Sequence, residues 1–374
     1  MEAAIAVLTV REIFDLVRDD LALVEREIAA QTGEAIEPIA EIGSYLREGG
    51  GKRLRPALLL LAAGACGYQG PSAVSLGAVV EMIHSATLIH DDVIDAANTR
   101  RGRPSANARW GNHMSVLAGD WLYMQSFKIA LQERNFTILD ILIDLTQNMV
   151  EGELLQLTHL NRIDLTEAEA ADLSYRKTAG LFRGCAELGA VLADADDSTR
   201  RALAEYGHQA GLAFQLVDDL LDFTASPEKV GKPVLSDLKE GKVTLPLIFA
   251  LQNGSARDAA LQAAAGQNGS PQNGGSEVHY EAHHDARHEV HHGGRDGHAA
   301  GRELVATVLR EKGFTSVRPE EITSLVRDSG ALECSRRLAC EYAARAKESL
   351  SVLKDSEFRR ALLAVPDFIL DRES

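Results

Sequence analysis

Apolar residues recur with the spacing of one helix face along most of this chain. In the longest stretches they stand at i, i+3, i+4 and i+7, and the helix-favouring residues Ala and Leu are plentiful. These stretches are residues 72–95, 115–133, 138–160, 167–192 and 198–223. Residues 105–226 contain no proline, and alternating strand patterns with Asn-Gly or Asp-Gly turns are nearly absent. The pattern predicts an all-α fold.

One segment, residues 264–302, lacks this periodicity. It is rich in Gly, Asn and His and almost free of Leu, Ile and Phe, so it cannot bury enough apolar surface to offset its ordering entropy. Its histidines could form a transition-metal-binding tract, but we favour a tolerated, disordered loop insertion between two helices. Because helical spacing resumes at Glu303 and continues through residues 331–353 and 358–370, we expect a single domain over residues 1–374 that this insertion interrupts.

Charge and composition exclude several classes of protein. The formal net charge of −16 argues against a general nucleic-acid binder and suits a protein that gathers divalent cations. The four cysteines have no C-x-x-C spacing, which is typical of reduced thiols in a cytoplasmic protein. The first residues lack the basic and apolar parts of a signal peptide, and the longest apolar run, residues 57–67, is about half the ~20 residues of a membrane span. We therefore expect a cytoplasmic protein without a transmembrane segment.

Two acidic clusters of identical spacing follow apolar helical stretches. They are DDVID at residues 91–95 and DDLLD at residues 218–222. The first and last carboxylates of each cluster lie about one turn apart on one helix face, where they repel each other unless a cation lies between them. Oxygen ligands without His or Cys favour Mg²⁺ or Mn²⁺ over zinc. A solvated helix end could explain one such cluster, but two of the same spacing favour a metal site.

Other polar residues accompany both clusters. His84 shares a helix face with Asp91, and Gln215 precedes the second cluster by about one turn. The glycine-rich turn GGGKRLRP at residues 49–56 could wrap a diphosphate with amide and side-chain donors. RRGRP at residues 100–104 follows the first cluster, and GKP at residues 231–233 follows the second. Each basic group alone is typical of a solvated face, but the repeated order of acid and base predicts a metal-bridged phosphate site.

Six ordered motifs resemble those of the trans-type polyprenyl diphosphate synthases. They are GGKRLRP, HSATLIHDDVID, RRGRP, RKTAGLF, FQLVDDLLD and GKVTLPLI, and the resemblance covers about residues 10–263 and 303–374. RRGRPSAN and the ending VPDFILDR further resemble the long-chain members that make octaprenyl, solanesyl or decaprenyl diphosphate for quinone side chains. The resemblance implies an isoprenoid synthase helical bundle, with a central cavity and the two acidic clusters facing each other across its mouth.

The resemblance also assigns roles to individual residues. It implies a cluster of three Mg²⁺ ions, which Mn²⁺ could replace. The main ligands of this cluster would be Asp91, Asp95 and Asp218, with support from Asp92, Asp219 and Asp222. It assigns the isopentenyl diphosphate site to Lys52, Arg55, His84 and Arg101. It assigns the allylic diphosphate site to Arg100, Lys177, Thr178, Gln215, Lys232 and Lys242, of which Arg100 and Lys177 join the aspartates in catalysis. The chain departs from many members in lacking a glycine shortly before Asp237, which predicts a differently arranged loop.

The implied reaction is repeated head-to-tail, trans condensation of isopentenyl diphosphate onto an allylic diphosphate primer. The allylic C–O bond ionises as metal and basic residues stabilise the leaving diphosphate, and the isopentenyl double bond adds to the cation. Ala86 and Thr87 lie about one turn below Asp91, where short-chain members carry a bulky aromatic residue that closes the product tunnel. Neither is aromatic here, so we expect a long product, and Ala86→Phe is expected to shorten it to about three or four isoprene units.

The resemblance further implies a homodimer that contacts a membrane only transiently, for product release. Three alternatives stay open at this point: a geranylgeranyl or farnesyl diphosphate synthase, a non-catalytic subunit of a heteromeric prenyl synthase, and a terpenoid cyclase or head-to-head condensing enzyme. A cyclase has no use for Lys52, Arg55 and a second acidic cluster with its lysines. Non-catalytic subunits typically lose acidic-motif residues, and all six aspartates are present here. We therefore favour the long-chain synthase.

Overall fold

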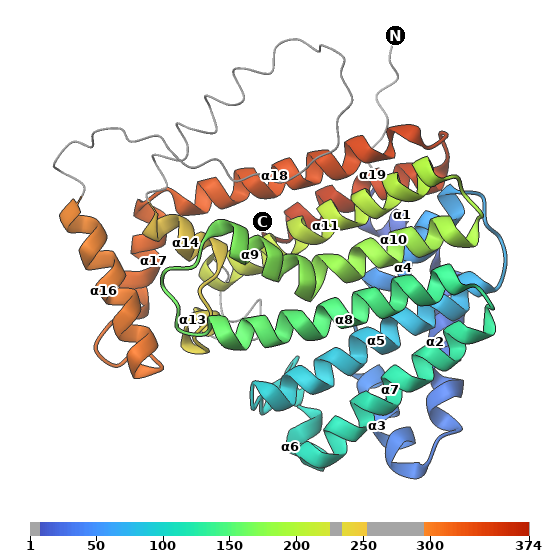
Figure 1. Ribbon diagram of the computed structural model, residues 1–374, viewed down its shortest axis with the longest axis horizontal. Helices are drawn as coiled ribbons and strands as arrows, with labels where there is room; N and C mark the ends of the chain where they lie inside the picture. Colours follow the sequence, from blue (N-terminus) through green and yellow to red (C-terminus); the bar gives the residue numbers. More distant parts are fainter. Residues whose placement is uncertain (1–7, 225–233, 253–294, 374) are drawn as a thin grey trace, which may run out of the picture.

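The computed structural model describes residues 8–224, 234–252 and 295–373, which form a bundle of packed helices (Figure 1). The helices up to the first acidic cluster are α1 (Val10–Asp15), α2 (Arg18–Gly33), α3 (Glu37–Glu48), α4 (Leu54–Ala65) and α5 (Ser72–Ile94). The middle helices are α6 (Ala106–Trp110), α7 (Asn112–Gln132), α8 (Phe136–His159), α9 (Glu167–Ser174), α10 (Gly180–Leu192) and α11 (Asp197–Thr224). The last are α13 (Ser236–Lys239), α14 (Leu245–Leu251), α16 (Arg295–Glu311), α17 (Pro319–Asp328), α18 (Ala331–Ser349) and α19 (Glu357–Leu370).

The all-α prediction is confirmed, and the long helices lie where the apolar spacing placed them. One predicted helix is interrupted, because a π-helical turn, Tyr175–Ala179, separates α9 from α10. At the start of α9, the Thr166 side chain accepts a hydrogen bond from the Glu169 amide at 3.2 Å, and the Glu169 carboxylate accepts one from the Thr166 amide at 2.8 Å. Short 3₁₀ turns extend α18 and α19, at Leu350–Val352 and Asp371–Glu373. Cys66, Cys185, Cys334 and Cys340 are all free thiols.

A short β-hairpin carries the basic motif that follows the first acidic cluster. Thr99–Arg100 (β1) pairs antiparallel with Arg103–Pro104 (β2), with Arg100 opposite Arg103. Arg101 and Gly102 form the two-residue turn and both have positive φ, at 51° and 75°. Positive φ at both positions matches the right-handed twist of a hairpin, and a glycine at the second position adopts it without steric cost. The hairpin thereby holds three arginines beside the end of α5.

The core lies where α4, α5, α10 and α11 pack against one another and against α18 and α19. Small residues allow the closest approaches: a Cβ on Gly189 of α10 would lie 2.6 Å from the amide nitrogen of Ala63 on α4. Among the described residues, α5 is the one helix both long and apolar enough to cross a membrane, and 61% of its most apolar window is buried inside the bundle. Burial against α2, α4 and α7 explains its apolar character as that of a core helix.

The boundary predicted for the insertion is wrong at its C-terminal side. We expected helical structure to resume at Glu303, but α16 begins at Arg295 and therefore includes residues 295–302 of the predicted insertion. Gly297 and Gly301 lowered the helical signal there, yet α16 packs against α14 and α17, and tertiary contact outweighs propensity. The rest of the predicted insertion lies outside the described residues, as does Lys232.

Candidate active site

The basic residues of the glycine-rich turn before α4 anchor the turn and line a cavity. Arg53, in a left-handed conformation with φ of 48°, donates to the carboxylate of Glu81 at 2.7 Å and also pairs with Glu25. These contacts anchor the turn to α2 and α5. Lys52, Arg53 and Arg55 all line a cavity of about 430 Å³, so all three stand where a ligand can reach them.

This cavity gathers cationic side chains from distant parts of the chain. Its walls include Lys52, Arg55, His84, Arg101 and Arg372, with Phe214 and Phe368 beside them. The Lys52 ammonium lies 5.0 Å from the ring centre of Phe368, and the Arg372 guanidinium lies 4.4 Å from that of Phe214. Arg101 donates to the carbonyl of Gly50, which fastens the hairpin tip to the glycine-rich turn. A concave site with this many cations suits a polyanion such as a diphosphate.

His84 is a neutral member of this cationic cavity. Burial, and then the nearby Arg55, lowers the pKa of His84 well below its usual value. Its Nε2 lies 3.1 Å from the Arg55 guanidinium, so a neutral ring can accept a hydrogen bond from that arginine. His84 therefore orients Arg55 within the cavity. The predicted role of His84 in binding isopentenyl diphosphate stays a prediction.

The three carboxylates of the first acidic cluster have different surroundings. Asp92 is buried, and its carboxylate accepts from Arg100 at 2.9 Å and 2.8 Å. Asp95 is the last residue of the turn that ends α5. Burial, helped by the negative charge of Glu153, raises the pKa of Asp91 to about 6. A carboxylate crowded in this way has a deficit of positive charge that a metal ion can supply.

The carboxylates of the second cluster also have different contacts. Asp218 pairs with Arg372 at 2.8 Å. Asp219 is buried and accepts from the Gln215 amide at 2.8 Å, while the Gln215 carbonyl accepts from the Thr178 hydroxyl at 2.6 Å. Burial, and then the charge of Asp237, raises the pKa of Asp219 well above its usual value. Asp219 is thus held in a fixed chain of hydrogen bonds.

Asp222 organises the loop that follows α11. It accepts from the backbone amide of Ser236 at 3.0 Å and from that of Asp237 at 3.2 Å, at the start of α13. Leu235, just before them, is buried and has a φ of 58°, the conformation that glycine adopts most easily. The chain therefore forms here, with leucine, a backbone conformation that usually requires glycine. Asp222 thus holds this loop in place, and its supporting role at the metal site stays a prediction.

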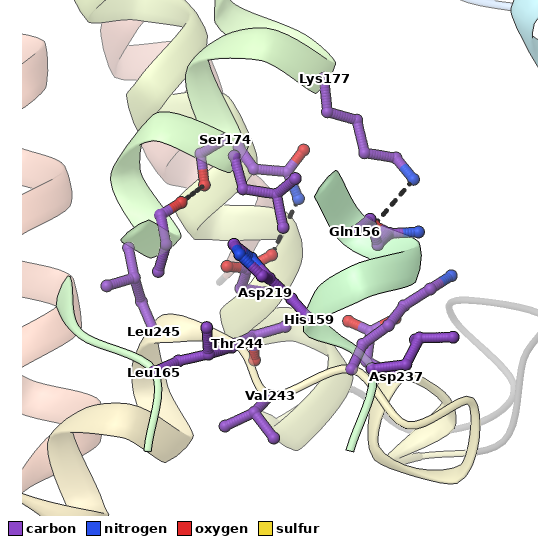
Figure 2. A pocket seen from close by; sticks show the side chains of 15 residues that line it. Gln156, His159, Leu165, Ser174, Lys177, Asp219, Asp237, Val243, Thr244 and Leu245 are labelled. Carbon is purple, nitrogen blue, oxygen red and sulfur yellow. Dashed lines mark hydrogen bonds between the residues drawn. The ribbon is translucent and has the colours of Figure 1, made fainter. Parts of the chain in front are cut away.

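Lys242 connects the two acidic clusters, because it contacts Asp95 of the first and lines one cavity with Asp219 of the second. Lys242, which follows α13, lies 3.4 Å from the carboxylate of Asp95. Although burial lowers the pKa of Lys242, Asp95 and Glu240 raise it above its usual value. Figure 2 shows Lys177 reaching toward Gln156 beside Asp219 and Asp237, and its ammonium donates to Gln156 at 3.1 Å. Residues of α8, the π-turn and α11 thus line one cavity, which Lys242 joins to Asp95 at the end of α5.

An apolar cavity of about 270 Å³ begins below Asp91. Its walls include Thr87, Tyr123, Met149, Val150 and Leu154. Of the two residues predicted to line a product tunnel, Thr87 lies on this wall, whereas Ala86 is fully buried in the core and does not. The apolar surface next to the acidic cluster can hold a growing hydrocarbon chain.

Sequence reasoning missed four residues that belong to these cavities. Glu153 and Gln156 bind Lys177, Glu81 binds Arg53, and Arg372 pairs with Asp218. The signal for the first two is the polar GExxQ at residues 152–156 inside an otherwise apolar helix face. Arg372 lies within the ending that carried part of the family resemblance, but its position beside α11 depends on tertiary packing.

The carboxylates fit hard divalent cations better than other metals. Within the described parts of the chain, no three His, Cys, Asp or Glu side chains converge as a ready-made metal cage. The clusters instead offer oxygen ligands at the ends of two helices, α5 and α11. Mg²⁺ is commonly bound in this way, by one or two carboxylates together with substrate phosphates. Asp91, Asp95 and Asp218 would hold it.

Comparisons with known proteins show which proteins this chain is similar to. The family model described as polyprenyl synthetase matches residues 36–279. An octaprenyl diphosphate synthase from Haemophilus influenzae is 34% identical, and the match covers 98% of each chain. A crystal structure of polyprenyl synthase from Caulobacter crescentus, complexed with calcium and isoprenyl diphosphate, has a TM-score of 0.81 and 32% identity over 98% of each chain. A decaprenyl diphosphate synthase structure from Rhodobacter capsulatus has a TM-score of 0.81 and 33% identity over 97% of this chain and 99% of that chain.

Proposed function

Because the chain belongs to the polyprenyl synthetase family, we propose that it is a Mg²⁺-dependent prenyltransferase that adds isopentenyl diphosphate repeatedly to an allylic diphosphate primer. The product is a long-chain, all-trans polyprenyl diphosphate in the octaprenyl to decaprenyl range, which serves as a quinone side chain. The observation that carries this proposal is the position of the first acidic cluster. Asp91 lines the apolar cavity, and Asp95 lies 3.4 Å from Lys242, which lines one cavity with Asp219 of the second cluster.

The cationic cavity supports binding of the isopentenyl diphosphate. Lys52, Arg55, Arg101 and Arg372 surround a space large enough for a diphosphate and a five-carbon group. His84 keeps the Arg55 guanidinium oriented, and Arg101 is fixed by the carbonyl of Gly50. Donors that are positioned before the substrate arrives lose little entropy when they bind it.

The cleft between α5 and α11 supports ionisation of the allylic diphosphate. When bound, Mg²⁺ ions supply positive charge that stabilises the leaving diphosphate. Lys177 and Lys242 add charge from the other walls, and the Thr178–Gln215–Asp219 chain keeps the second cluster rigid. The allylic C–O bond breaks, the isopentenyl double bond forms a new C–C bond with the cation, and the departing diphosphate accepts the proton lost afterwards. Apolar walls exclude water that would quench the cation.

The apolar cavity below Asp91 supports a long product. Thr87 lies on its wall and no aromatic side chain stands at this position to block it. Growth toward the apolar end of the cavity leaves the diphosphate at the acidic clusters, so another isopentenyl unit can add in the same place. This observation favours the long-chain activity over a geranylgeranyl or farnesyl diphosphate synthase, which needs a closed floor.

An exposed apolar face supports a homodimer. Nine large apolar side chains on α7 and α8 are exposed: Val116, Leu117, Met124, Leu131, Phe136, Ile143, Val150, Leu154 and Leu157. An apolar face of this size marks a protein–protein contact more often than a free surface. We infer that a second copy of the chain covers it, in the cytoplasm, and that product release involves transient contact with a membrane. Replacing Phe136 and Leu117 with Lys should convert the dimer to a monomer in light scattering.

Incorporation of labelled isopentenyl diphosphate tests the activity. The purified chain is expected to incorporate label onto farnesyl diphosphate with Mg²⁺ and to stop when a chelator is added. Asp91→Asn with Asp95→Asn should abolish incorporation, while Asp140→Asn with Asp144→Asn, an i, i+4 pair on α8 outside this site, should not. A folded chain that incorporates nothing with Mg²⁺ would instead be the non-catalytic subunit of a heteromeric synthase.

A further inference from the structure

Two neighbouring basic residues of the π-turn form ion pairs with two glutamates of α8. Arg176 donates to Glu151 at 2.6 Å, and Lys177 pairs with Glu153 at 2.7 Å. Gly152 lies between the two glutamates and lets the turn approach: a Cβ there would lie 2.8 Å from the Cβ of Arg176 and 3.3 Å from the Lys177 amide. The close contact at Gly152 thus fixes which glutamate each basic residue meets.

The two ion pairs have different surroundings. The Glu151–Arg176 pair lies outside the cavities, and 43% of the Glu151 side chain is exposed. In the Glu153–Lys177 pair the carboxylate is more buried, with 19% of the Glu153 side chain exposed, while Lys177 at 29% is about as exposed as Arg176 at 25%. Lys177 lines the polar cavity of Figure 2 with Asp219, whereas Glu153 lines the apolar cavity with Asp91. The inner pair therefore stands at the boundary between the two cavities.

The contacts of Lys177 orient its ammonium and still leave a donor for a ligand. Gln156 and Glu153 accept two hydrogen bonds or ion contacts from its ammonium, at 3.1 Å and 2.7 Å. An ammonium has three donors, so one more can reach a ligand in the polar cavity. A lysine side chain is otherwise long and flexible, and a half-buried carboxylate restricts it more firmly than a neutral amide does.

We propose that Glu153 is a positioning residue, whose carboxylate holds the Lys177 ammonium at the cavity boundary so that the cation is already in place when an allylic diphosphate ionises. The inference rests on the proposed function, in which Lys177 stabilises the leaving diphosphate. Because a loose lysine still attracts a diphosphate, Glu153 acts mainly on turnover and only weakly on binding. Preorganised charge lowers the barrier because it needs no rearrangement during the reaction.

Steady-state kinetics of Glu153→Gln, Lys177→Gln and the double variant test this inference. Glu153→Gln is expected to lower kcat about tenfold and to leave KM for the allylic primer and for isopentenyl diphosphate within about twofold. Lys177→Gln lowers kcat and raises KM for the allylic primer. The double variant should lose no more than Lys177→Gln, because Glu153 acts through Lys177. Glu151→Gln, the matched control on the outer pair, keeps the parent's kcat.

Three results overturn the inference. Losses that multiply in the double variant would mean that Glu153 acts independently of Lys177, and parent-like kinetics in Glu153→Gln would mean that it does not act at all. An equal loss in Glu151→Gln would indicate a structural effect of any ion pair on α8, which melting temperatures of the variants also report. If the parent chain itself incorporates no isopentenyl diphosphate, the proposed function fails before Glu153 is in question.

Discussion

The Lys242 ammonium lies 3.4 Å from the carboxylate of Asp95, although 147 positions separate the two residues in the chain. Asp95 ends the first acidic helix, and Lys242 follows the loop that Asp222 of the second cluster organises. This contact connects the two acidic motifs across the cleft. Lys242 also lines the cavity that holds Lys177, so two lysines supply positive charge there.

Lys242→Gln is expected to lower kcat/KM for the allylic primer by about tenfold or more, because a charge close to the leaving diphosphate is lost. The KM for isopentenyl diphosphate should change little. Lys239→Gln is the matched control, since Lys239 ends α13 three positions before Lys242 but has its ammonium 5.4 Å from the ring centre of Phe314. Equal losses in both variants would show that loop folding, and not charge at Asp95, explains the effect.

The contacts of Arg372 predict that its substitution favours Mg²⁺ binding and weakens binding of isopentenyl diphosphate. It pairs with Asp218 at 2.8 Å and also lines the cationic cavity. Arg372→Gln should therefore lower the Mg²⁺ concentration needed for half-maximal activity and raise KM for isopentenyl diphosphate, each by about threefold to tenfold. Arg360→Gln, on the exposed side of α19, should change neither. Unchanged Mg²⁺ dependence in Arg372→Gln would mean that the arginine does not compete with metal for Asp218.

The position of Thr87 predicts control of product length. Thr87→Phe places a ring in the apolar cavity about one turn below Asp91, and the main product should shorten to about three or four isoprene units. Ala86→Phe is a less direct test than the sequence indicated, because Ala86 is fully buried and a larger side chain there costs about 1–3 kcal/mol of stability. Chromatography of dephosphorylated products measures the distribution. A Thr87→Phe product as long as the parent's would contradict the tunnel assignment.

The pKa of Asp91 predicts how pH affects the metal-free protein. Burial raises this pKa to about 6, above the value near 4 of an unfolded aspartate. Between these values the folded chain keeps a proton that the unfolded chain releases, so the free energy of unfolding falls as pH rises from about 4 to about 6. Asp91→Asn removes this contribution, which is at most about 3 kcal/mol. In chelator at pH 7 it should melt above the parent, whereas an equal or lower melting temperature would contradict the raised pKa.

Much of this arrangement could be predicted from local pattern. Apolar spacing identified the long helices because each buries one face, and DDVID and DDLLD identified the clusters because repelling carboxylates at one-turn spacing need a reason. The position of Thr178 beside Gln215 agrees with the shared site that the motifs indicated.

The remaining features depend on contacts that local pattern does not encode. Glu153 resembles any polar residue on a helix, and only the close approach at Gly152 brings Lys177 to it. Leu235 adopts a left-handed backbone that its residue type disfavours, because Asp222 binds the amides that follow it. The start of the helix at Arg295 was placed too late, at Glu303, for a related reason, since packing of this helix against α14 and α17 outweighs two glycines.

The sharing of metal ions between the two acidic clusters is best tested by a crystal structure with Mg²⁺ and a non-ionisable allylic thiolodiphosphate. We expect metal ions between the diphosphate and Asp91 and Asp95 on one side and Asp218 on the other, with Arg372 released from Asp218. A diphosphate bound elsewhere, or Asp218 still paired with Arg372 and no metal between the two clusters, would contradict it.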